Sequence, residues 1–227
     1  MLAVDKPAGI VVFPENESLK SGEITLMDLL IEKYPKLKKT GEAPRYGATH
    51  RLDKDTSGIL LVAKNTQTLI FLQKQFKNRE VEKKYTVLVS GKIKENSGKI
   101  KTLMGRSKSD PRKQVAINPG NRAPDAREAI TLYEVKEYFS QYTLLAVQIK
   151  TGRRHQIRCH LSFIHHPVVG DKLYGFKDSP CPEGLERQFL HANYLKIKLP
   201  NGKTEEFFSE LPVELKDILN KLEKNNE

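Results

Sequence analysis

THRLDKDTSGILLVAKN, residues 49–65, joins a polar run to a continuous apolar segment. Residues 58–64 are bounded by Gly and Asn and have the pattern of a buried strand. Asn65 is a favoured helix N-cap, and apolar residues recur at helical spacing over residues 66–78: Leu69, Leu72 and Phe76. A polar loop held by a rigid core strand is a common location for catalytic groups. The alternative is a solvated turn in which Asp, Ser and Thr side chains bond to their own backbone.

The other expected elements are mostly strands. Strands are predicted over residues 2–5, 10–13, 84–90, 128–136, 143–150 and 190–199, and helices over 25–34, 153–165 and 213–224. The basic residues 36–45 are predicted to form a loop, and the Gly and Pro residues between 92 and 125 predict short strands joined by mobile loops. Asn201-Gly202 predicts a hairpin turn. Few strand–helix–strand units line up, which favours an α+β fold with a mixed, largely antiparallel sheet and flanking helices.

The composition is that of a basic chain of 227 residues, long enough to form one large domain. It has 39 Lys and Arg residues against 28 Asp and Glu residues, a formal net charge of +11. This surplus favours polyanionic partners, because each neutralised phosphate releases counterions. The alternative is a soluble protein that is basic without such a partner.

The apolar runs argue against a membrane protein. The longest, residues 10–13 and 58–63, fall far short of the roughly 20 residues that a membrane span needs, and the start MLAVDKPAG lacks the features of a secretory signal. Cys159 and Cys181 are the two cysteines, and their spacing suggests neither a disulfide framework nor a zinc site. We therefore expect a reducing, cytoplasmic location.

A second polar cluster, KTGRRHQIRCHL at residues 150–161, opens the helix expected over 153–165. A helix N-terminus favours phosphate, and arginines donate two-point hydrogen bonds to it. The alternative is an ordinary basic face, with Arg154 and Arg158 pointing away from the buried side of the helix. The five-residue spacing of His155 and His160 does not match the HExxH pattern of zinc sites. GxSxG, Walker A and Rossmann glycine patterns do not occur either.

The run HRLDKDTSGILLVAKN at residues 50–65 resembles the signature of the RluA-type pseudouridine synthases. Four further blocks agree with that family in order and spacing: KPAG at 6–9, VEKKYTVLVSG at 81–91, TGRRHQIRCHLSFIHHPVVGDKLYG at 151–175 and RQFLHANYLKIKLP at 187–200. The resemblance extends over roughly residues 3–212. Five blocks in register make it highly specific.

The resemblance implies roles for individual residues. It makes Asp53 the catalytic carboxylate, and Arg158 the basic partner that pairs with Asp53. Tyr85 becomes the aromatic residue that packs against the target uracil and a candidate proton acceptor. Arg51 would help to replace the flipped uridine in the RNA stack, or else contact a phosphate. Ile157 would line the base pocket, or else belong to the core.

The implied activity is the isomerisation of uridine to pseudouridine in structured RNA, ribosomal or transfer, without a metal or organic cofactor. His50 and Arg154 are expected among the RNA-binding residues. We expect a monomer, and no S4-like RNA-binding module is visible within residues 1–227. The cations of residues 99–113 are expected to hold the RNA backbone, or to form a solvated loop: Lys99, Lys101, Arg106, Lys108, Arg112 and Lys113.

The rival hypothesis is an RNA-binding protein that keeps the fold but has no turnover. The presence of Asp53, Tyr85 and Arg158 together argues against this hypothesis, because binding alone has no physical need for all three.

Overall fold

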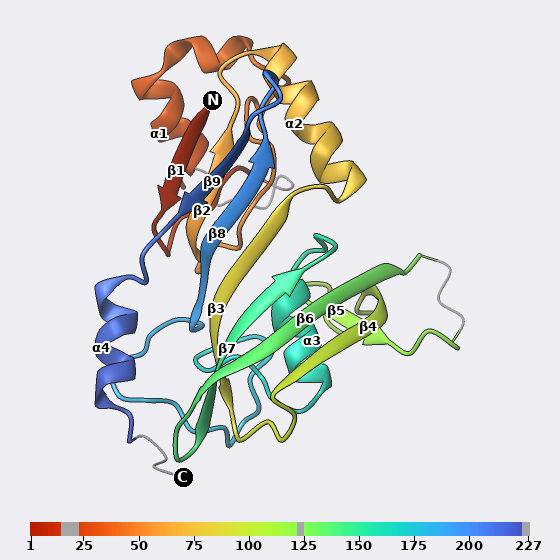
Figure 1. Cartoon of the computed structure of the whole chain (residues 1–227), viewed down its shortest axis with the longest axis vertical. Helices are drawn as coiled ribbons and strands as arrows, with labels where there is room; N and C mark the ends of the chain where they lie inside the picture. Colours follow the sequence, from red (N-terminus) through yellow and green to blue (C-terminus); the bar gives the residue numbers. More distant parts are fainter. Residues whose placement is uncertain (15–22, 122–124, 224–227) are drawn as a thin grey trace. The chain divides into compact units, whose positions relative to one another are not determined.

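The computed structural model describes residues 1–14, 23–121 and 125–223 (Figure 1). The chain divides into two compact units. Unit 1 comprises Met1–Glu82 and Ala192–Glu210, and unit 2 comprises Lys83–His191 and Leu211–Glu227. The expectation that residues 1–227 form one large domain stays a prediction. In the part of the chain that the structure describes, no helix is both long and apolar enough to cross a membrane.

Unit 1 is built around a buried strand. Its elements are β1 (Leu2–Lys6), α1 (Leu26–Lys33), a 3-10 helix (Pro35–Lys39), β2 (Ser57–Val62), α2 (Thr66–Asn78), most of β8 (Leu190–Lys198) and β9 (Thr204–Phe208). The strands follow the order β1-β2-β8, with β9 also paired to β8. The β1–β2 and β8–β9 pairs are antiparallel, and the predicted turn at Asn201-Gly202 connects β8 to β9. The strand β9 itself was not predicted.

All six residues of β2 are buried, because apolar side chains cover both faces of the strand. Leu60 and Val62 pack in a cluster with residues of α1, including Met27 and Ile31. Ile59 and Leu61 pack in a second cluster with residues of α2 and β8: Leu69, Leu72, Leu195 and Ile197. This two-sided burial explains why the strand has no alternating polar positions. The sequence prediction of a buried strand here is confirmed, and helix α2 begins and ends where it was expected.

The strand predicted over residues 10–13 is wrong. The carbonyl groups of Val11 and Val12 accept hydrogen bonds from Leu26 N and Met27 N, at 2.8 and 3.0 Å. They therefore satisfy the first turn of α1 instead of a neighbouring strand. Val12 and Phe13 are nevertheless buried in the core of unit 1.

Unit 2 is an antiparallel sheet with two helices. Its strands follow the order β3-β7-β6-β4-β5. Their bounds are β3 (Glu82–Ser90), β4 (Ser97–Arg106), β5 (Gln114–Ile117), β6 (Arg127–Tyr138) and β7 (Tyr142–Ile149). Helix α3 (Gln156–Phe163) packs with β5 and β6, and α4 (Val213–Lys221) contributes to a cluster around Phe139 and Phe189. Together the two units confirm the expected α+β class.

The prediction of short strands after residue 92 is partly wrong. Strand β4 is ten residues long and pairs with β6 from Ser97↔Glu134 to Met104↔Arg127. Gly98 and Gly105, two of the glycines that suggested turns, lie inside this strand. A Cβ atom at Gly98 would come within 2.5 Å of the Tyr133 ring, so the glycine makes room for a cross-strand aromatic side chain.

Helix α3 is shorter and more buried than predicted. Residues Arg153 to His155 form a turn before it, and His155 has a left-handed backbone with φ 54°. The prediction that Arg158 points away from the buried side of the helix is wrong. Arg158 is buried together with its neighbours Ile157 and Cys159. Ile164 is half-buried just beyond the helix.

Buried polar side chains fix α3 to the sheet. The two ring nitrogens of His160 hydrogen-bond to Thr102 Oγ1 and Thr131 Oγ1, at 2.9 and 2.8 Å. Gln156 donates from Nε2 to Ile130 O and Thr131 Oγ1, both at 3.0 Å. The polar residues of the HQIRCH segment are therefore in part structural, because they satisfy one another where water is excluded.

Acid should weaken unit 2 through His160. Burial lowers the pKa of His160 to about 4 from its usual 6.5, so the unfolded chain takes up this proton first. The stability that neutral His160 contributes is complete above pH 6.5 and is lost as the pH falls toward 4, by about 3 kcal/mol in total. Urea unfolding between pH 7 and 4 should show a steeper loss for the wild type than for His160→Gln. Equal pH slopes in the two proteins would contradict this assignment.

Candidate active site

The first residues of the polar loop 49–57 are fixed to β2 by hydrogen bonds. Thr49 N and Oγ1 both donate to Leu61 O, at 3.2 and 2.8 Å. Leu61 N donates in return to Nε2 of His50 at 3.2 Å, so this ring nitrogen is an acceptor. The His50 ring also stacks on Phe76 of α2, with the centroids 4.7 Å apart. These contacts give His50 a structural position, and its expected contact with RNA stays a prediction.

A buried lysine fixes the middle of the same loop. Lys6, at the end of β1, is 1% exposed, and its ammonium donates to the carbonyl oxygens of Pro7, Ile10 and Lys54 at 2.8–2.9 Å. Gly9 N donates to Lys54 O as well, at 3.0 Å. The KPAG segment thus clamps the backbone next to Asp53. KPAG was expected only as a block of the family resemblance, and the contact of Lys6 with the loop was not predicted.

Asp53 occupies a defined position on this loop. Leu52 before it is 5% exposed, and Asp53 itself is half-buried. Thr56 N donates to the carbonyl oxygen of Asp53 at 3.1 Å, which closes a turn just before β2. The loop is therefore held by Lys6 and Thr49, by the buried Leu52 and by its own turn. Such a scaffold presents one carboxylate at a fixed place.

Arg51 lies beside an aromatic ring. Its guanidinium carbon is 5.8 Å from the centroid of Phe13, and that of Arg45 is 5.0 Å from the same ring. Both distances are within cation–π range. Phe13 thus supports two arginines close to the loop. The contact accounts for the half-buried position of Arg51 and is compatible with either expected role.

The lysine-x-tyrosine strand lies in unit 2. Tyr85 is 7% exposed and pairs with Val147 of β7 in register. Lys83 has the same orientation on β3, because successive side chains alternate between the two faces of a strand. Burial lowers the pKa of Lys83 to about 8, and its ammonium lies 3.6 Å from where a Cβ atom on Gly152 would stand. Tyr85 was predicted as a site residue from the sequence, whereas Lys83 was not.

Arg158 forms a buried, two-point ion pair with Asp171. Its Nε and Nη2 atoms donate to Asp171 Oδ2 and Oδ1, at 2.6 and 2.8 Å. Leu173 N and Tyr174 N also donate to Oδ1. Burial alone would raise the pKa of Asp171, but the hydrogen bonds and charge of Arg158 and the two backbone N–H groups outweigh it and hold the pKa below its usual range.

This partner was missed by sequence reasoning, which paired Arg158 with Asp53. Asp53 lies in unit 1 and Arg158 in unit 2, so that pairing stays a prediction. The signal for Asp171 was present in the sequence, since an acidic residue follows Gly170 in the same block as the arginine.

Ile157 is 5% exposed within α3, and Arg154 is half-buried in the turn before it. Burial of Ile157 suits both of its expected roles, in the base pocket and in the core.

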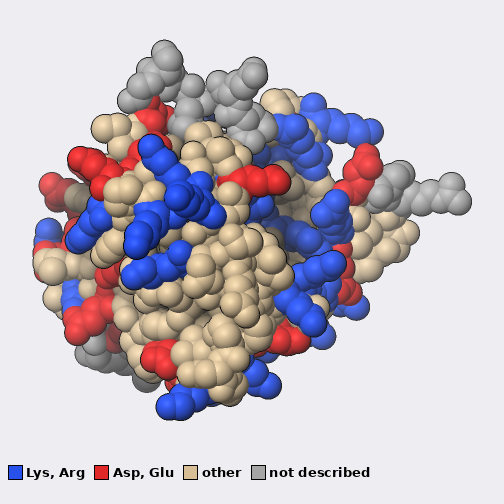
Figure 2. All heavy atoms as spheres, turned by 90° about the horizontal axis from the view of Figure 1, so that it is seen from above, with Lys and Arg blue, Asp and Glu red and all other residues tan. Residues whose placement is uncertain are grey.

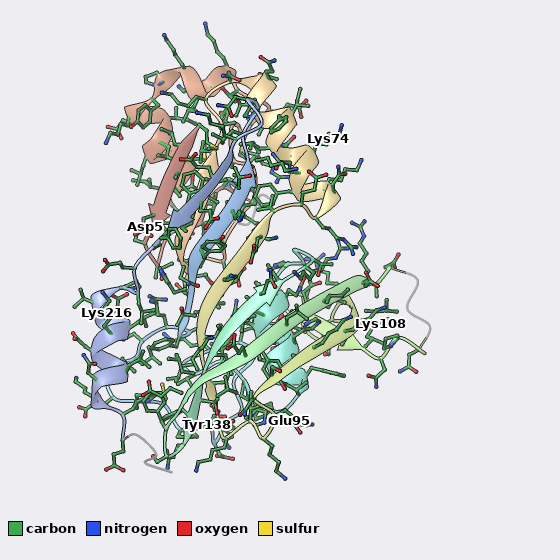
Figure 3. The ribbon with its side chains drawn as sticks, in the orientation of Figure 1. Asp5, Lys74, Glu95, Lys108, Tyr138 and Lys216 are labelled. Carbon is green, nitrogen blue, oxygen red and sulfur yellow. The ribbon has the colours of Figure 1, made fainter. Side chains whose placement is uncertain are left out.

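The cations of residues 99–113 divide into two groups. Lys101 and Arg112 face acidic residues at 3.4 and 2.8 Å, whereas Lys108 is exposed in the connection from β4 to β5 (Figure 3).

Among residues 1–14, 23–121 and 125–223, the His, Cys, Asp and Glu side chains form no group of three or more that could hold a metal ion. Cys159 and Cys181 are both free thiols, the first buried and the second exposed.

Known proteins resemble this chain over most of its length. A family model described as RNA pseudouridylate synthase matches residues 1–163. An uncharacterised RNA pseudouridine synthase of Chloroflexus aurantiacus is 40% identical over 220 residues, 96% of this chain and 66% of the relative. The ribosomal large subunit pseudouridine synthase D of Haemophilus ducreyi is 34% identical, over 98% of this chain and 68% of the relative. The chain thus spans about two thirds of the length of these relatives.

A solved structure supports the same grouping. The human protein described as RNA pseudouridylate synthase domain containing 4 aligns with a TM-score of 0.75 and 26% sequence identity. The alignment covers 99% of this chain and 91% of the human one. The likeness therefore includes both units.

Asp171→Asn should destabilise unit 2. The variant leaves the buried guanidinium of Arg158 without a counter-charge, and breaking such a pair from one side typically costs about 3–5 kcal/mol. Urea unfolding measures this loss. Asp110→Asn is the matched control, because Asp110 forms a two-point pair with Arg112 whose side chain is 76% exposed. Its unfolding should match that of the wild type. An equally small effect at Asp171 would mean that the buried pair is not needed.

Proposed function

Because the chain belongs to the RNA pseudouridylate synthase family, and within it to the RluA-type enzymes, we propose that it isomerises uridine to pseudouridine in RNA. The observation that carries the proposal is the position of Asp53 on a loop fixed by Thr49, Lys6 and a turn at Thr56. The activity concerns the whole protein, of which this chain spans about two thirds in the bacterial relatives.

The reaction needs few chemical groups. The C1′–N1 bond of uridine breaks, and a C1′–C5 bond forms to the same uracil. N1 gains a proton and C5 loses one, so the isomerisation consumes no oxidant or reductant. We therefore propose that it proceeds without a metal or organic cofactor. The target uridine must leave any base stack to be reached, which costs a few kcal/mol unless it lies in a loop.

Asp53 is the proposed catalytic carboxylate. A carboxylate can attack a sugar carbon and form a covalent intermediate, as in retaining glycosidases. Attack on the base and removal of a ribose proton are the other two paths open to it. Glycosidases need a second carboxylate partly to protonate a departing group. Uracil stays in the pocket, so one carboxylate is enough here.

Tyr85 and Arg158 are the proposed partners of Asp53 in the reaction. The phenol of Tyr85 would accept or relay the C5 proton while its ring packs against uracil. Arg158 would keep Asp53 ionised in a partly dry pocket. Two of the five N–H groups of its guanidinium donate to Asp171. Asp171 then acts as a positioning residue that fixes the plane of this guanidinium.

The remaining expected residues are assigned to RNA recognition. We propose that Arg51 takes the place of the flipped uridine in the stack and that Ile157 lines the base pocket. Arg154 and His50 would contact the RNA near the target. The name of the Haemophilus ducreyi relative favours ribosomal RNA over transfer RNA as the substrate. A cytoplasmic monomer that acts on structured RNA is the form of the enzyme we propose.

The rival hypothesis is an RNA-binding protein without turnover. Such a protein would bind RNA with the same salt dependence, so binding does not separate the two. Product formation separates the two hypotheses. In the proposed enzyme it depends on the carboxylate of Asp53 and not on that of the neighbouring Asp55.

Asp53→Asn tests this directly. The substitution keeps the volume of the side chain but removes its charge and nucleophilicity, so pseudouridine formation should fall below detection. RNA affinity should stay within a few-fold of the wild type, because no cation is lost. The assay is chemical labelling of pseudouridine in total RNA, read by mass spectrometry. Asp55→Asn, on the same turn and also half-buried, is the control and should remain active. An inactive Asp55→Asn beside an active Asp53→Asn would refute the proposed mechanism.

A further inference from the structure

A cavity of about 250 Å³ lies in unit 1, where α1 ends and the 3-10 helix begins. Its lining is formed by Lys33, Tyr34, Pro35, Lys36, Leu37 and Lys64. None of these residues belongs to the loop of residues 49–57. The cavity is therefore a separate feature from the candidate active site.

The floor of this cavity is part of the fixed scaffold. Tyr34 ends α1 and begins the 3-10 helix, and its backbone N–H donates to Leu30 O at 2.8 Å. Leu37 N donates to Tyr34 O at 2.9 Å, and the Leu37 side chain is 1% exposed within the core of unit 1. The half-buried Tyr34 side chain packs against the same core cluster.

Three exposed lysines line the cavity together with this ring. The ammonium groups of Lys33 and Lys64 lie 5.9 and 5.8 Å from the centroid of Tyr34, within cation–π range. Lys36 also lines the cavity, and within the described ranges none of the three forms an ion pair with an acidic residue. Because neighbouring cations repel one another, the gathering of three lysines without an acidic partner among the described residues favours an anionic ligand.

In Figure 2, which looks onto the side of the molecule that carries α1 and α2, Lys and Arg side chains form clusters beside areas without charge. An aromatic ring together with cations is the combination that binds single-stranded nucleic acid, because bases stack on the ring and phosphates contact the cations. The cavity is smaller than the roughly 300–1,000 Å³ of pockets for drug-sized ligands, and a single nucleobase suits it better.

We infer that this Tyr34 pocket binds one single-stranded nucleotide of the RNA substrate, with its base against the ring and its phosphate among Lys33, Lys36 and Lys64. The inference rests on the proposed function for the identity of the ligand. It adds a second RNA contact on unit 1, outside the loop that carries Asp53.

The test compares two triple variants that remove the same charge. Lys33→Ala/Lys36→Ala/Lys64→Ala changes the pocket, and Lys74→Ala/Lys77→Ala/Lys203→Ala changes exposed lysines elsewhere in unit 1 (Lys74 is labelled in Figure 3). The probe is a fluorescent oligouridylate of about ten nucleotides, within the site sizes of single-strand binding proteins. Its affinity is measured by anisotropy at several salt concentrations.

The pocket triple should bind the probe at least about 10-fold more weakly, and its slope of log K against log salt should fall by up to about 2, since each contact to a single strand contributes about 0.7. The control triple should stay within about 2-fold of the wild type. Tyr34→Leu should weaken binding without changing the slope, because it removes the ring and no charge. Equal losses in both triples would overturn the inference, as would competition by polyglutamate as strong as that by unlabelled oligouridylate.

Product formation separates this inference from the proposed function. The pocket triple should raise KM for RNA while kcat is retained, because none of the three lysines belongs to the loop of residues 49–57. If the wild type forms pseudouridine and the pocket triple binds like the control, the pocket assignment alone is wrong. If the pocket triple binds more weakly and the wild type forms no pseudouridine, the pocket stands and the proposed function is wrong.

Discussion

The buried ammonium group of Lys6 is the contact on which the position of the proposed catalytic loop depends. Burying a lysine costs several kcal/mol unless hydrogen bonds replace its water. The three carbonyl oxygens of Pro7, Ile10 and Lys54 provide that replacement. In return, the ammonium fixes the backbone at Lys54, the residue that follows Asp53. One charge in the core of unit 1 therefore ties β1, the KPAG turn and the loop of residues 49–57 into one rigid piece.

Unit 2 also contains a buried charged side chain whose hydrogen bonds to water are replaced by hydrogen bonds within the protein. There the buried charge is negative. Asp171 is buried and accepts hydrogen bonds from Arg158 and from two backbone N–H groups. His160 and Gln156, on the same helix, hold α3 against β4 and β6. Polar residues that look like an exposed basic face in the sequence thus serve partly to orient one guanidinium. A planar group held at two points keeps its direction, which a flexible lysine at the same place would not.

Local patterns predicted most of the fold. The apolar run before Lys64 and the Asn65 cap gave β2 and α2 correctly, because burial on both faces and a capped amphipathic helix leave clear signatures. The predictions failed where tertiary contacts decide the outcome. Val11 and Val12 bond to the start of α1, and Gly98 serves the Tyr133 ring inside a long strand. The site residues came from family resemblance, whereas the roles of Asp171 and Lys6 needed the structure, because a motif does not show which polar groups a buried charge contacts.

The most direct test of the central claim is the fate of the C5 hydrogen. RNA transcribed with uridine that carries tritium at C5 is incubated with the purified protein, and released tritium and free uracil are both measured. Isomerisation predicts tritium release into water in step with pseudouridine, with an unchanged RNA mass apart from the label and no free uracil. Release of uracil would show hydrolysis of the glycosidic bond, and retention of all tritium would show binding without turnover. Either result would contradict the account.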